Sequence, residues 1–282
     1  MSKASPQVAV IIRTYNEGRR IGACLRAVMQ QDYAPGFEVL LVDTESTDET
    51  VAIARQFGVG VVLLERRRFS FGRALNMGAT VVRSEYLVYL SADAVPERTD
   101  YLTRLTAPLA DPQVAAAYGR QLPAAGCCPS EARDLEDWFP PEFRPLPRPF
   151  LSNASAVVRR AVWREHPFDE QVASAEDAVW AAEVTLAGYR IAYAPLATVR
   201  HSHPAWPQVA YRRGYREADG LRQVDPSLRH FGLWRMLRMA GGLSYLDWRF
   251  ALRNGYGAWW WAHIPLYRLA QAWGIYRGLG KR

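Results

Sequence analysis

Carboxylates at three points of the sequence stand where they could do chemistry. Asp43 ends the apolar run FEVLLVD, Asp93 ends EYLVYLSAD, and Glu176 with Asp177 opens a helical pattern. A carboxylate just past a buried strand can accept hydrogen bonds from a nucleoside or bind a hard divalent cation. A carboxylate in the first turn of a helix can take a proton from a hydroxyl nucleophile. These residue types indicate nucleotide binding, metal binding and general-base chemistry.

Each carboxylate also has a structural interpretation. Asp43 could complete a turn with Thr47 at a helix start, and Asp93 could form an Asx turn whose next bend is set by Pro96. Ser174 and Asp177 have the spacing of a capping box, and the helix dipole favours acids there in any case. Taken one at a time, the acids leave both interpretations open.

The first half of the chain alternates strand and helix signals that would position these acids. Short apolar runs predict strands over residues 8–13, 37–43, 59–65 and 85–93, and helical spacing predicts helices over 18–31, 48–58 and 72–84. This order favours an α/β fold with a mostly parallel sheet and helices on both faces. Ligands bind beyond the carboxyl ends of such strands. The polar residues at those ends are Arg13, Thr14, Asn16, Glu17, Asp43 and Asp93.

The second half begins with a stretch rich in Pro and Gly. Residues 119–150 predict a long irregular excursion, after which strand and helix signals return over 152–163. Residues 174–190 predict a helix, and 191–195 predict a strand that leads into TVRHSH. Of the two histidines in that segment, His201 and His203, we expect one to reach a metal and the other to face away as a loop histidine.

Composition excludes several classes of protein. The chain has 282 residues, of which 49% are hydrophobic and 22% charged, so it has enough apolar residues for a sizeable core and is not a disordered or fibrous protein. No run of 18 apolar residues suits a membrane span, and no signal peptide is apparent, so we expect a cytoplasmic protein. Three cysteines without a C-x-x-C pair predict reduced thiols.

The C-terminal part is basic and aromatic. Residues 201–282 carry 13 Lys and Arg against 4 Asp and Glu, and hold seven of the ten tryptophans. Arg and Trp at helical spacing suit the surface of an anionic membrane, packing on the rest of the protein, or a dimer interface, and all three remain open. Nucleic acid is disfavoured because the basic residues have bulky apolar neighbours and no known binding module is present.

Five segments in order carry a resemblance to a known family. RTYNE, VDTESTDET, FGRALNMGA, the strand that ends in Asp93 with Pro96 after it, and EDAVWA followed by HSH resemble the family-two glycosyltransferases of the GT-A fold over about residues 6–204. RRFSFGRALNMGA with SAEDAVWA is most similar to bacterial rhamnosyltransferases of cell-surface polysaccharide assembly. The resemblance implies a GT-A domain over 1–204. Residues 205–282 lie outside the match, and their helical pattern predicts an extension that lies on the inner face of the cell membrane, packs or dimerises.

The family's activity comes with the resemblance. It implies inverting transfer of a sugar, with rhamnose a candidate, from a nucleotide diphosphate sugar to a hydroxyl of a cell-surface glycan or lipid-linked intermediate. Asp177 would be the catalytic base, and Asp93 with His201, or with His203 as the alternative, would hold Mg²⁺ or Mn²⁺. The residues expected to bind the nucleotide-sugar are Arg13, Thr14, Asn16, Glu17, Asp43, Arg73, Asn76, Gly78, Asp93, Asn153 and Glu176.

Three positions depart from the family pattern. Ser91 replaces the first aspartate of the D-x-D metal motif, Phe71 stands where histidine is frequent, and Leu75 stands where arginine is common. Ser91 keeps open a second function, a catalytically degenerate protein that binds nucleotide-sugar or glycan, whereas Asp177 argues for an enzyme. A nucleotidyltransferase is disfavoured because RTYNEGRR lacks the Gly-rich loop usual after the first strand of such enzymes.

Overall fold

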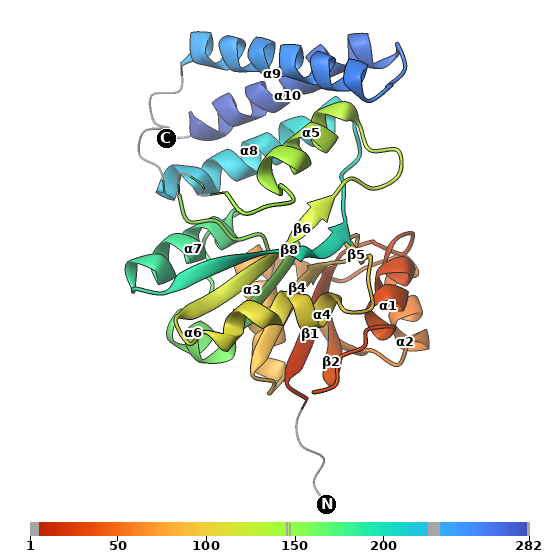
Figure 1. Ribbon diagram of the computed structural model, residues 1–282, viewed down its shortest axis with the longest axis vertical. Coiled ribbons are helices and arrows are strands. Elements are labelled where there is room, and N and C mark those ends of the chain that lie inside the picture. The colour runs from red at the N-terminus through yellow and green to blue at the C-terminus, as the bar shows by residue number, and fades with distance from the viewer. Residues whose placement is uncertain (1–5, 145, 147, 225–231, 281–282) are drawn as a thin grey trace, which may run out of the picture. The chain divides into compact units, whose positions relative to one another are not determined.

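The structure is a computed structural model that describes residues 6–144, 146, 148–224 and 232–280 (Figure 1). The chain divides into two compact units. The first comprises Met1–Gln121, Pro141–Val172 and Glu176–His201, and the second comprises Leu122–Pro140, Ala173–Ala175 and Ser202–Arg282. The functional division expected at residue 204 stays a prediction, and residues 225–231 and 281–282 of the expected extension lie outside the described part.

A mixed sheet forms the centre of the first unit. Its strand order is β3-β2-β1-β4-β7-β6-β8-β5, and the strands β1, β2, β3 and β4 run parallel. β7 is antiparallel to β4 and β6, and β5 is antiparallel to β8. The strands are β1 (Val8–Thr14), β2 (Phe37–Asp43), β3 (Gly60–Leu63), β4 (Tyr86–Ser91), β5 (Val95–Pro96), β6 (Val114–Leu122), β7 (Ser155–Arg159) and β8 (Arg190–Arg200). The predicted α/β fold is confirmed, with its parallel part in the first half of the chain.

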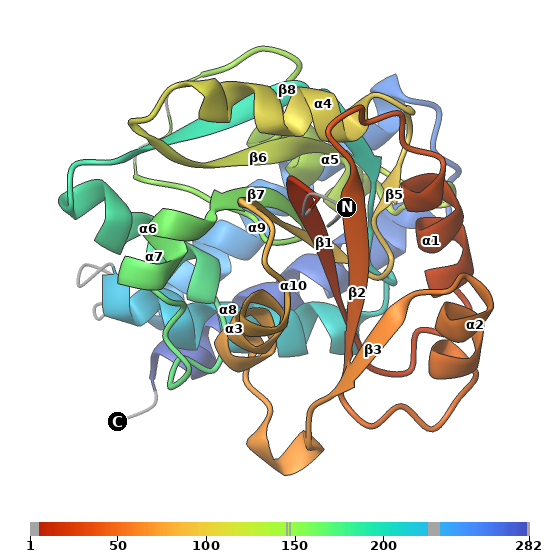
Figure 2. The same cartoon turned by 90° about the horizontal axis from the view of Figure 1, so that it is seen from below.

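Helices flank this sheet (Figure 2). They are α1 (Ile21–Met29), α2 (Thr50–Gln56), α3 (Phe71–Val81), α4 (Tyr101–Thr106), α6 (Arg160–Glu165) and α7 (Glu176–Leu186), with short 3-10 helices η1 (Arg66–Arg68) and η2 (Ala107–Ala110). Helix α1 shows why they form: its buried residues Ile21, Cys24, Leu25 and Val28 recur at helical spacing and pack with strand residues such as Ile12. Burial of these apolar faces drives the layered packing.

The second unit is helical. It contains α5 (Pro129–Trp138), α8 (Pro207–Val224), α9 (Leu233–Arg253) and α10 (Trp260–Leu279). Helices α8 and α10 approach closely because glycines lie between them: a Cβ on Gly214 would meet the Gln271 carbonyl oxygen at 2.6 Å. Of the helices in the described residues, each is too short or too polar to cross a bilayer.

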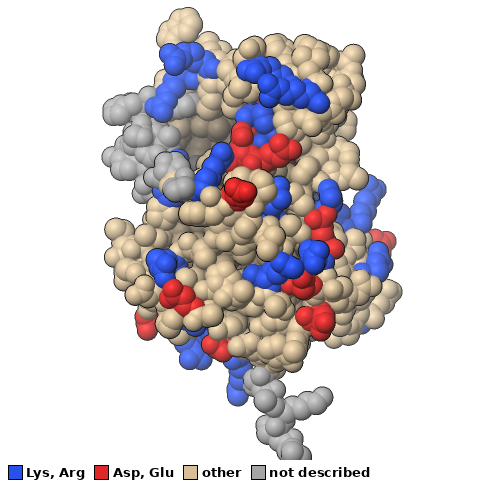
Figure 3. Space-filling model, in the orientation of Figure 1, with Lys and Arg blue, Asp and Glu red and all other residues tan. Residues whose placement is uncertain are grey.

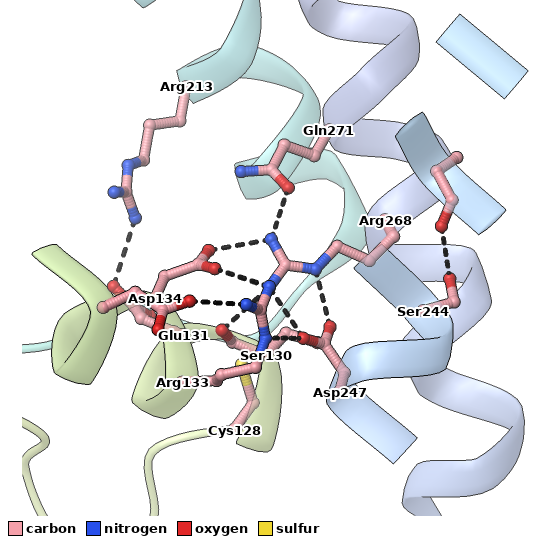
Figure 4. Close-up of polar contacts among 12 residues, drawn as sticks. Cys128, Ser130, Glu131, Arg133, Asp134, Arg213, Ser244, Asp247, Arg268 and Gln271 are labelled. Carbon is pink, nitrogen blue, oxygen red and sulfur yellow. Dashed lines mark hydrogen bonds and ion pairs between the residues drawn. The ribbon is translucent and has the colours of Figure 1, made fainter. Parts of the chain in front are cut away.

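A buried ion-pair cluster joins α5, α9 and α10 within this unit (Figure 4). The Arg268 guanidinium donates to both carboxylate oxygens of Asp134, at 2.7 and 2.8 Å, and its Nε donates to Asp247 at 2.6 Å. Arg133 Nε also donates to Asp247, at 2.6 Å. Asp247 is 0% exposed and Arg268 is 1% exposed. Such a cluster holds its helices in register because each buried charge has a partner.

The irregular excursion expected over residues 119–150 is wrong in two places. Strand β6 continues to Leu122, and α5 occupies Pro129–Trp138. Pro129 stands in the first turn of α5, where a missing N–H costs nothing. Strand β8 also runs five residues beyond the expected end at residue 195. The helical pattern expected from residue 205 is confirmed for the described residues.

Candidate functional site

The loops after β1 and β2 are joined through Asp43. Its Oδ1 accepts from Thr14 Oγ1 at 2.9 Å and from Ser46 Oγ at 2.6 Å, and its Oδ2 accepts from the Ser46 N–H at 2.8 Å. Thr14 and Asp43 are also register partners at the ends of the two parallel strands. Asp43 is buried, so its carboxylate organises the carboxyl edge of the sheet at the place where a nucleotide would bind.

Asn16 completes the connection between these loops. It has a φ of 54°, a left-handed conformation that asparagine tolerates better than most residues. Its Oδ1 accepts from the Thr47 N–H at 2.8 Å, and its own N–H donates to Ser46 Oγ at 2.8 Å. The Glu17 N–H donates to Thr50 Oγ1 at 2.8 Å. These hydrogen bonds fix the loop after β1 against the loop after β2, beside Asp43.

Asp93 and His201 come together beyond β4. His201 Nε2 lies 3.4 Å from Asp93 Oδ1, and an Arg20 guanidinium nitrogen lies 3.5 Å from Asp93 Oδ2 and 3.6 Å from Glu17 Oε2. Burial, and then the charge of Asp93, raise the pKa of Glu17. Arg20 thus links the Asp93–His201 pair to Glu17 in the loop after β1.

The tautomer of His201 follows from its second contact. Gln121 Nε2 donates to Ser152 Oγ at 2.8 Å, which leaves Gln121 Oε1 as the acceptor 2.8 Å from His201 Nδ1. Nδ1 therefore donates to Gln121, and Nε2 is the ring nitrogen that faces Asp93. A partner that orients the other ring nitrogen is typical of metal-binding histidines.

The residues present fit a divalent ion that is shared with a diphosphate. Among the described residues, no group of three or more His, Cys, Asp or Glu is placed to hold a metal. Asp93 and His201 would supply two ligands, and Mg²⁺ or Mn²⁺ bound to a diphosphate takes its remaining ligands from phosphate oxygens and water. The fit therefore depends on the donor being present.

Asp177 lies at the start of α7 with its carboxylate fixed on both sides. Its Oδ2 accepts from the Asn153 N–H at 3.3 Å, and its Oδ1 accepts from the Ala178 N–H at 2.9 Å. Burial and the adjacent Glu176 carboxylate raise the pKa of Asp177 to about 7, although both backbone hydrogen bonds oppose that shift. A carboxylate with a pKa near neutrality is suited to general-base catalysis.

Glu176 is held by two partners. Its Oε1 lies 3.4 Å from an Arg13 guanidinium nitrogen and accepts from Asn153 Nδ2 at 3.3 Å. Asn153 Oδ1 is buried and has no hydrogen-bond partner among the described residues. A buried unpaired carbonyl is costly, so this atom is suited to accept a hydrogen bond from a ligand hydroxyl.

Strand register brings Asp93 and Asp177 to the same edge of the sheet. Leu90 of β4 pairs with Ser155 of β7, and the Ser91 N–H donates to the Ala154 carbonyl oxygen at 3.1 Å. Asp93 comes two residues after the end of β4, and Asn153, which holds Asp177, comes two residues before the start of β7. Asp43 at the end of β2, Asp93 after β4 and Asp177 beside the entrance to β7 thus lie along one edge of the sheet.

Phe71 has a role that sequence reasoning missed. Its ring lies under the Arg13 guanidinium, 4.4 Å from the ring centroid to Arg13 Cζ. Arg13 is therefore held between Phe71 of α3 and Glu176 of α7, where a cation–π contact and an ion pair both restrict it. The departure at residue 71 was visible in the sequence, but its partner depends on tertiary structure.

Three residues of α3 that we expect to bind the donor, Arg73, Asn76 and Gly78, are in contact with other residues of the protein. Arg73 Nε donates to Glu170 at 2.7 Å. The Asn76 amide donates to the Phe168 carbonyl oxygen and to Glu170, and accepts from Trp163 Nε1 and the Phe168 N–H, so its hydrogen-bonding capacity is used. A Cβ on Gly78 would collide with Ile11 Cγ2. Packing alone accounts for Asn76 and Gly78, and a donor contact there stays a prediction.

His203 belongs to the second unit and has different partners. Its Nδ1 lies 2.7 Å from Glu131 Oε1, and its N–H donates to the same carboxylate at 3.0 Å. Arg213 also donates to Glu131, at 3.1 Å. The structure therefore places His201 beside Asp93 and gives His203 a contact with α5, so we take His201 forward as the metal candidate.

Comparisons with known proteins point in one direction. Residues 9–164 match the family model described as Glycosyl transferase family 2. The chain is 30% identical over 220 residues to the O-antigen chain rhamnosyltransferase RfbN of Salmonella typhimurium, covering 73% of this chain and 70% of that protein. It is 31% identical over 221 residues to the O-antigen chain rhamnosyltransferase WbaN of Salmonella anatum, covering 74% and 70%.

A solved structure has the same fold. The mannosyltransferase PcManGT from Pyrobaculum calidifontis, in complex with GDP-Man and Mn²⁺, matches with a TM-score of 0.64 at 22% identity. The match covers 95% of this chain and 87% of that one. At 22% identity this likeness establishes the fold alone. Membership of the family rests on the family model and on the two Salmonella relatives.

Proposed function

Because the chain belongs to glycosyltransferase family 2, an inverting family, and has the GT-A fold, we propose that it transfers rhamnose from a nucleotide diphosphate donor to a hydroxyl of a cell-surface glycan or lipid-linked intermediate. Both Salmonella relatives are named as O-antigen chain rhamnosyltransferases, which supports the choice of sugar and acceptor class. That the protein is a nucleotide-sugar glycosyltransferase follows from the family itself.

The position of Asp177 carries the mechanism. The acceptor hydroxyl attacks the anomeric carbon on the side opposite the leaving diphosphate, and Asp177 accepts the hydroxyl proton as the new bond forms. The Asn153 N–H fixes one oxygen of this base, while burial and then the Glu176 carboxylate keep the pKa of Asp177 high enough for it to bind a proton near neutrality. Attack from the opposite face inverts the anomeric centre.

The remaining residues bind the donor. We assign Thr14, Asn16, Glu17 and Asp43 to the nucleotide, and Arg13 and Arg73 to the diphosphate or its sugar. Asp93 and His201 would hold Mg²⁺ or Mn²⁺, which supplies positive charge to the departing diphosphate when bound. Stabilising the negative charge that develops on the leaving diphosphate is commonly a large part of catalysis in group transfer.

Ser91 supports a second candidate, a protein of the same fold that binds nucleotide-sugar without transfer. The first position of the D-x-D motif lacks its carboxylate, and the described residues contain no metal-binding group of three. Such a protein would bind the donor but would release no nucleoside diphosphate from it, whether or not an acceptor is present.

A donor panel tests the proposal. We expect dTDP-rhamnose at about 100 times its dissociation constant to raise the melting temperature by about 5 °C through mass action, more than GDP-mannose or UDP-glucose does. With Mn²⁺ and an acceptor glycan, the same donor should release dTDP. A donor that binds without release supports the degenerate protein, and preference for another nucleotide-sugar contradicts the choice of rhamnose.

A further inference from the structure

Helix α9 presents two parallel stripes of side chains to solvent. Its apolar stripe contains Trp234, Leu237, Tyr245, Trp248 and Leu252. Consecutive members are three, eight, three and four residues apart, so they lie on one side of the helix. Trp234 is 81% exposed and Leu252 is 62% exposed. Beside it runs a basic stripe of Arg235, Arg238, Arg249 and Arg253, all exposed. At 100° per residue, each stripe occupies one sector of the helix, and together they form what we call the α9 face.

The opposite side of α9 is occupied by packing. Its buried residues are Met236, Ala240, Ser244, Asp247 and Ala251, and Met236 and Ala240 pack with Ala272 of α10. The large side chains of the α9 face are therefore not needed for the helix to pack within its own unit. Leaving a contiguous row of Trp, Tyr and Leu in water is unfavourable unless a partner covers it.

The charge of the α9 face has one sign. Asp247 is the single acid between residues 232 and 280 of the sequence, and it is buried against Arg268 and Arg133 (Figure 4). Figure 3 shows basic side chains over α9, with no acidic side chain among them in this view. The buried cluster thus removes the negative charge that would otherwise offset the arginines.

The apolar stripe continues onto the start of α10. Trp248 stacks with Trp261 at a ring separation of 6.1 Å, and its Nε1 donates to the Trp261 carbonyl oxygen at 3.1 Å. Trp259, two residues before Trp261 in the sequence, is 69% exposed. Indole rings of this kind suit the boundary between lipid headgroups and acyl chains, because one edge is polar and the body is apolar.

We propose that the α9 face docks on the surface of an anionic lipid bilayer. Arginines beside an apolar stripe match a surface that is negative outside and apolar beneath. A second copy of the chain fits less well, because a two-fold contact would bring the two arginine stripes near each other. The helix would lie along the bilayer surface, since no helix in the described part of the chain suits a span. This inference is independent of the donor and of the reaction.

Vesicle flotation of the full chain tests the surface. We expect the protein to float with vesicles of 40% phosphatidylglycerol and 60% phosphatidylcholine at low salt, and not with pure phosphatidylcholine. Arg238→Gln with Arg249→Gln should lower the partition coefficient about 30-fold, because each arginine near such a surface contributes about a factor of five. Trp234→Ser with Leu252→Ser should abolish flotation while leaving the melting temperature unchanged.

Matched controls lie in the first unit. Arg26→Gln with Arg55→Gln removes the same charge from exposed helix positions, and Leu186→Ser removes a leucine that is 89% exposed. Both should float like the unchanged protein. The proposal is overturned if the unchanged protein does not float, or if these controls lose as much binding as the α9 variants. Sedimentation velocity that shows a dimer dissociated by the α9 variants would assign the face to a second copy instead.

Discussion

The Asp177 carboxylate illustrates how two interpretations of one residue coexist. Its place in the first turn of α7 suits the helix dipole, as the structural interpretation holds. Its second oxygen, however, accepts a hydrogen bond from Asn153, which lies 24 residues earlier in the chain at the entrance to β7. Burial beside Glu176 then raises its pKa to about 7. A residue needed only to start a helix would be more stable fully ionised.

This raised pKa predicts how stability depends on pH. The pKa of Asp177 is about 7 in the folded protein and near 3.8 in the unfolded chain, so folding takes up a proton between these values. Its contribution to stability is complete below pH 3.8 and is lost as pH rises through 7. The unfolding free energy of Asp177→Asn, measured relative to the unchanged protein at the same pH, should therefore be higher at pH 8 than at pH 5.

Urea denaturation at the two pH values measures this difference. Glu183→Gln on the same helix is the control, because Glu183 is exposed and its pair with His166 lies at the surface. If the difference in unfolding free energy between Asp177→Asn and the unchanged protein is the same at both pH values, the Asp177 carboxyl is ionised without cost.

The Asp93 and His201 pair predicts dependence on a divalent metal. Chelation with EDTA should lower nucleoside diphosphate release by about tenfold or more, and added Mn²⁺ should restore it. Asp93→Asn should shift the Mn²⁺ concentration for half-maximal release upward, because one of two protein ligands is weakened. Release that is indifferent to EDTA would contradict the metal assignment while leaving the base assignment intact.

At the residue scale, the sequence indicates the acids but not the side chains that hold them. Asp43, Asp93 and Asp177 stand out because each adjoins a strong strand or helix signal. The Arg13–Phe71 contact and the Gln121–His201 hydrogen bond join residues 58 and 80 positions apart, so they depend on strand order and register. Neither can be inferred from local pattern.

Gly78 connects helix α3 to the sheet. A Cβ at this position would collide with Ile11 Cγ2 in the middle of β1 and would lie 3.2 Å from Val42 Cγ2 near the end of β2. Gly78→Ala should destabilise the protein by about 1–3 kcal/mol, because a well-packed interior resists an added methyl group. Thermal or urea unfolding would measure this loss.

A matched glycine gives the opposite expectation. Gly242 of α9 is exposed, and a Cβ there would meet nothing within 4 Å. Gly242→Ala should stabilise its helix by up to about 1 kcal/mol through helix propensity. Unchanged stability of Gly78→Ala together with weakened donor binding would instead favour the direct donor contact expected for Gly78.

Arg268 connects three helices of the second unit. Arg268→Met should cost about 3–5 kcal/mol of unfolding free energy, because Asp134 and Asp247 would lose their bidentate and buried partner. Arg277→Met on the exposed side of α10 should change stability by less than about 0.5 kcal/mol.

A compensating variant separates charge from packing. Asp247→Leu combined with Arg268→Met removes both buried charges, so the pair should be less destabilised than Arg268→Met alone. Equal loss in the single and double variants, read by urea unfolding, would show that the Arg268 side chain stabilises the unit through its shape.

At the element scale, sequence patterns predict the four parallel strands and β7 well and β8 in part, but they miss β5 and β6. VAVIIR is a β-branched run buried on both faces, and the last four residues of FEVLLVD are buried as well, which is a strong signal. VAAAYGRQL of β6 is rich in alanine and glycine and has little intrinsic strand preference, so its tertiary partners determine it. Helix α5 was missed because its proline and acidic residues resemble a loop.

At the scale of the whole molecule, the proposed donor and base residues all belong to the first compact unit. Arg13, Thr14 and Asp43 end its parallel strands, and Asn16, Glu17 and Asp93 lie in the loops that follow them. Arg73 lies on α3, Asn153 at the entrance to β7 and Asp177 on α7, so segments more than 80 residues apart converge on one edge of the sheet. The fold and family were predictable because the strand ends recur in order, whereas the roles of single residues need measurement.

Turnover of Asp177→Asn at saturating donor tests the central claim most directly. The account predicts that donor affinity, measured by calorimetry, stays within about threefold, while transfer falls by about 100-fold or more because the acceptor proton has no base. Glu183→Gln should transfer at the normal rate. Near-normal transfer by Asp177→Asn, with its fold and donor affinity intact, would contradict the account.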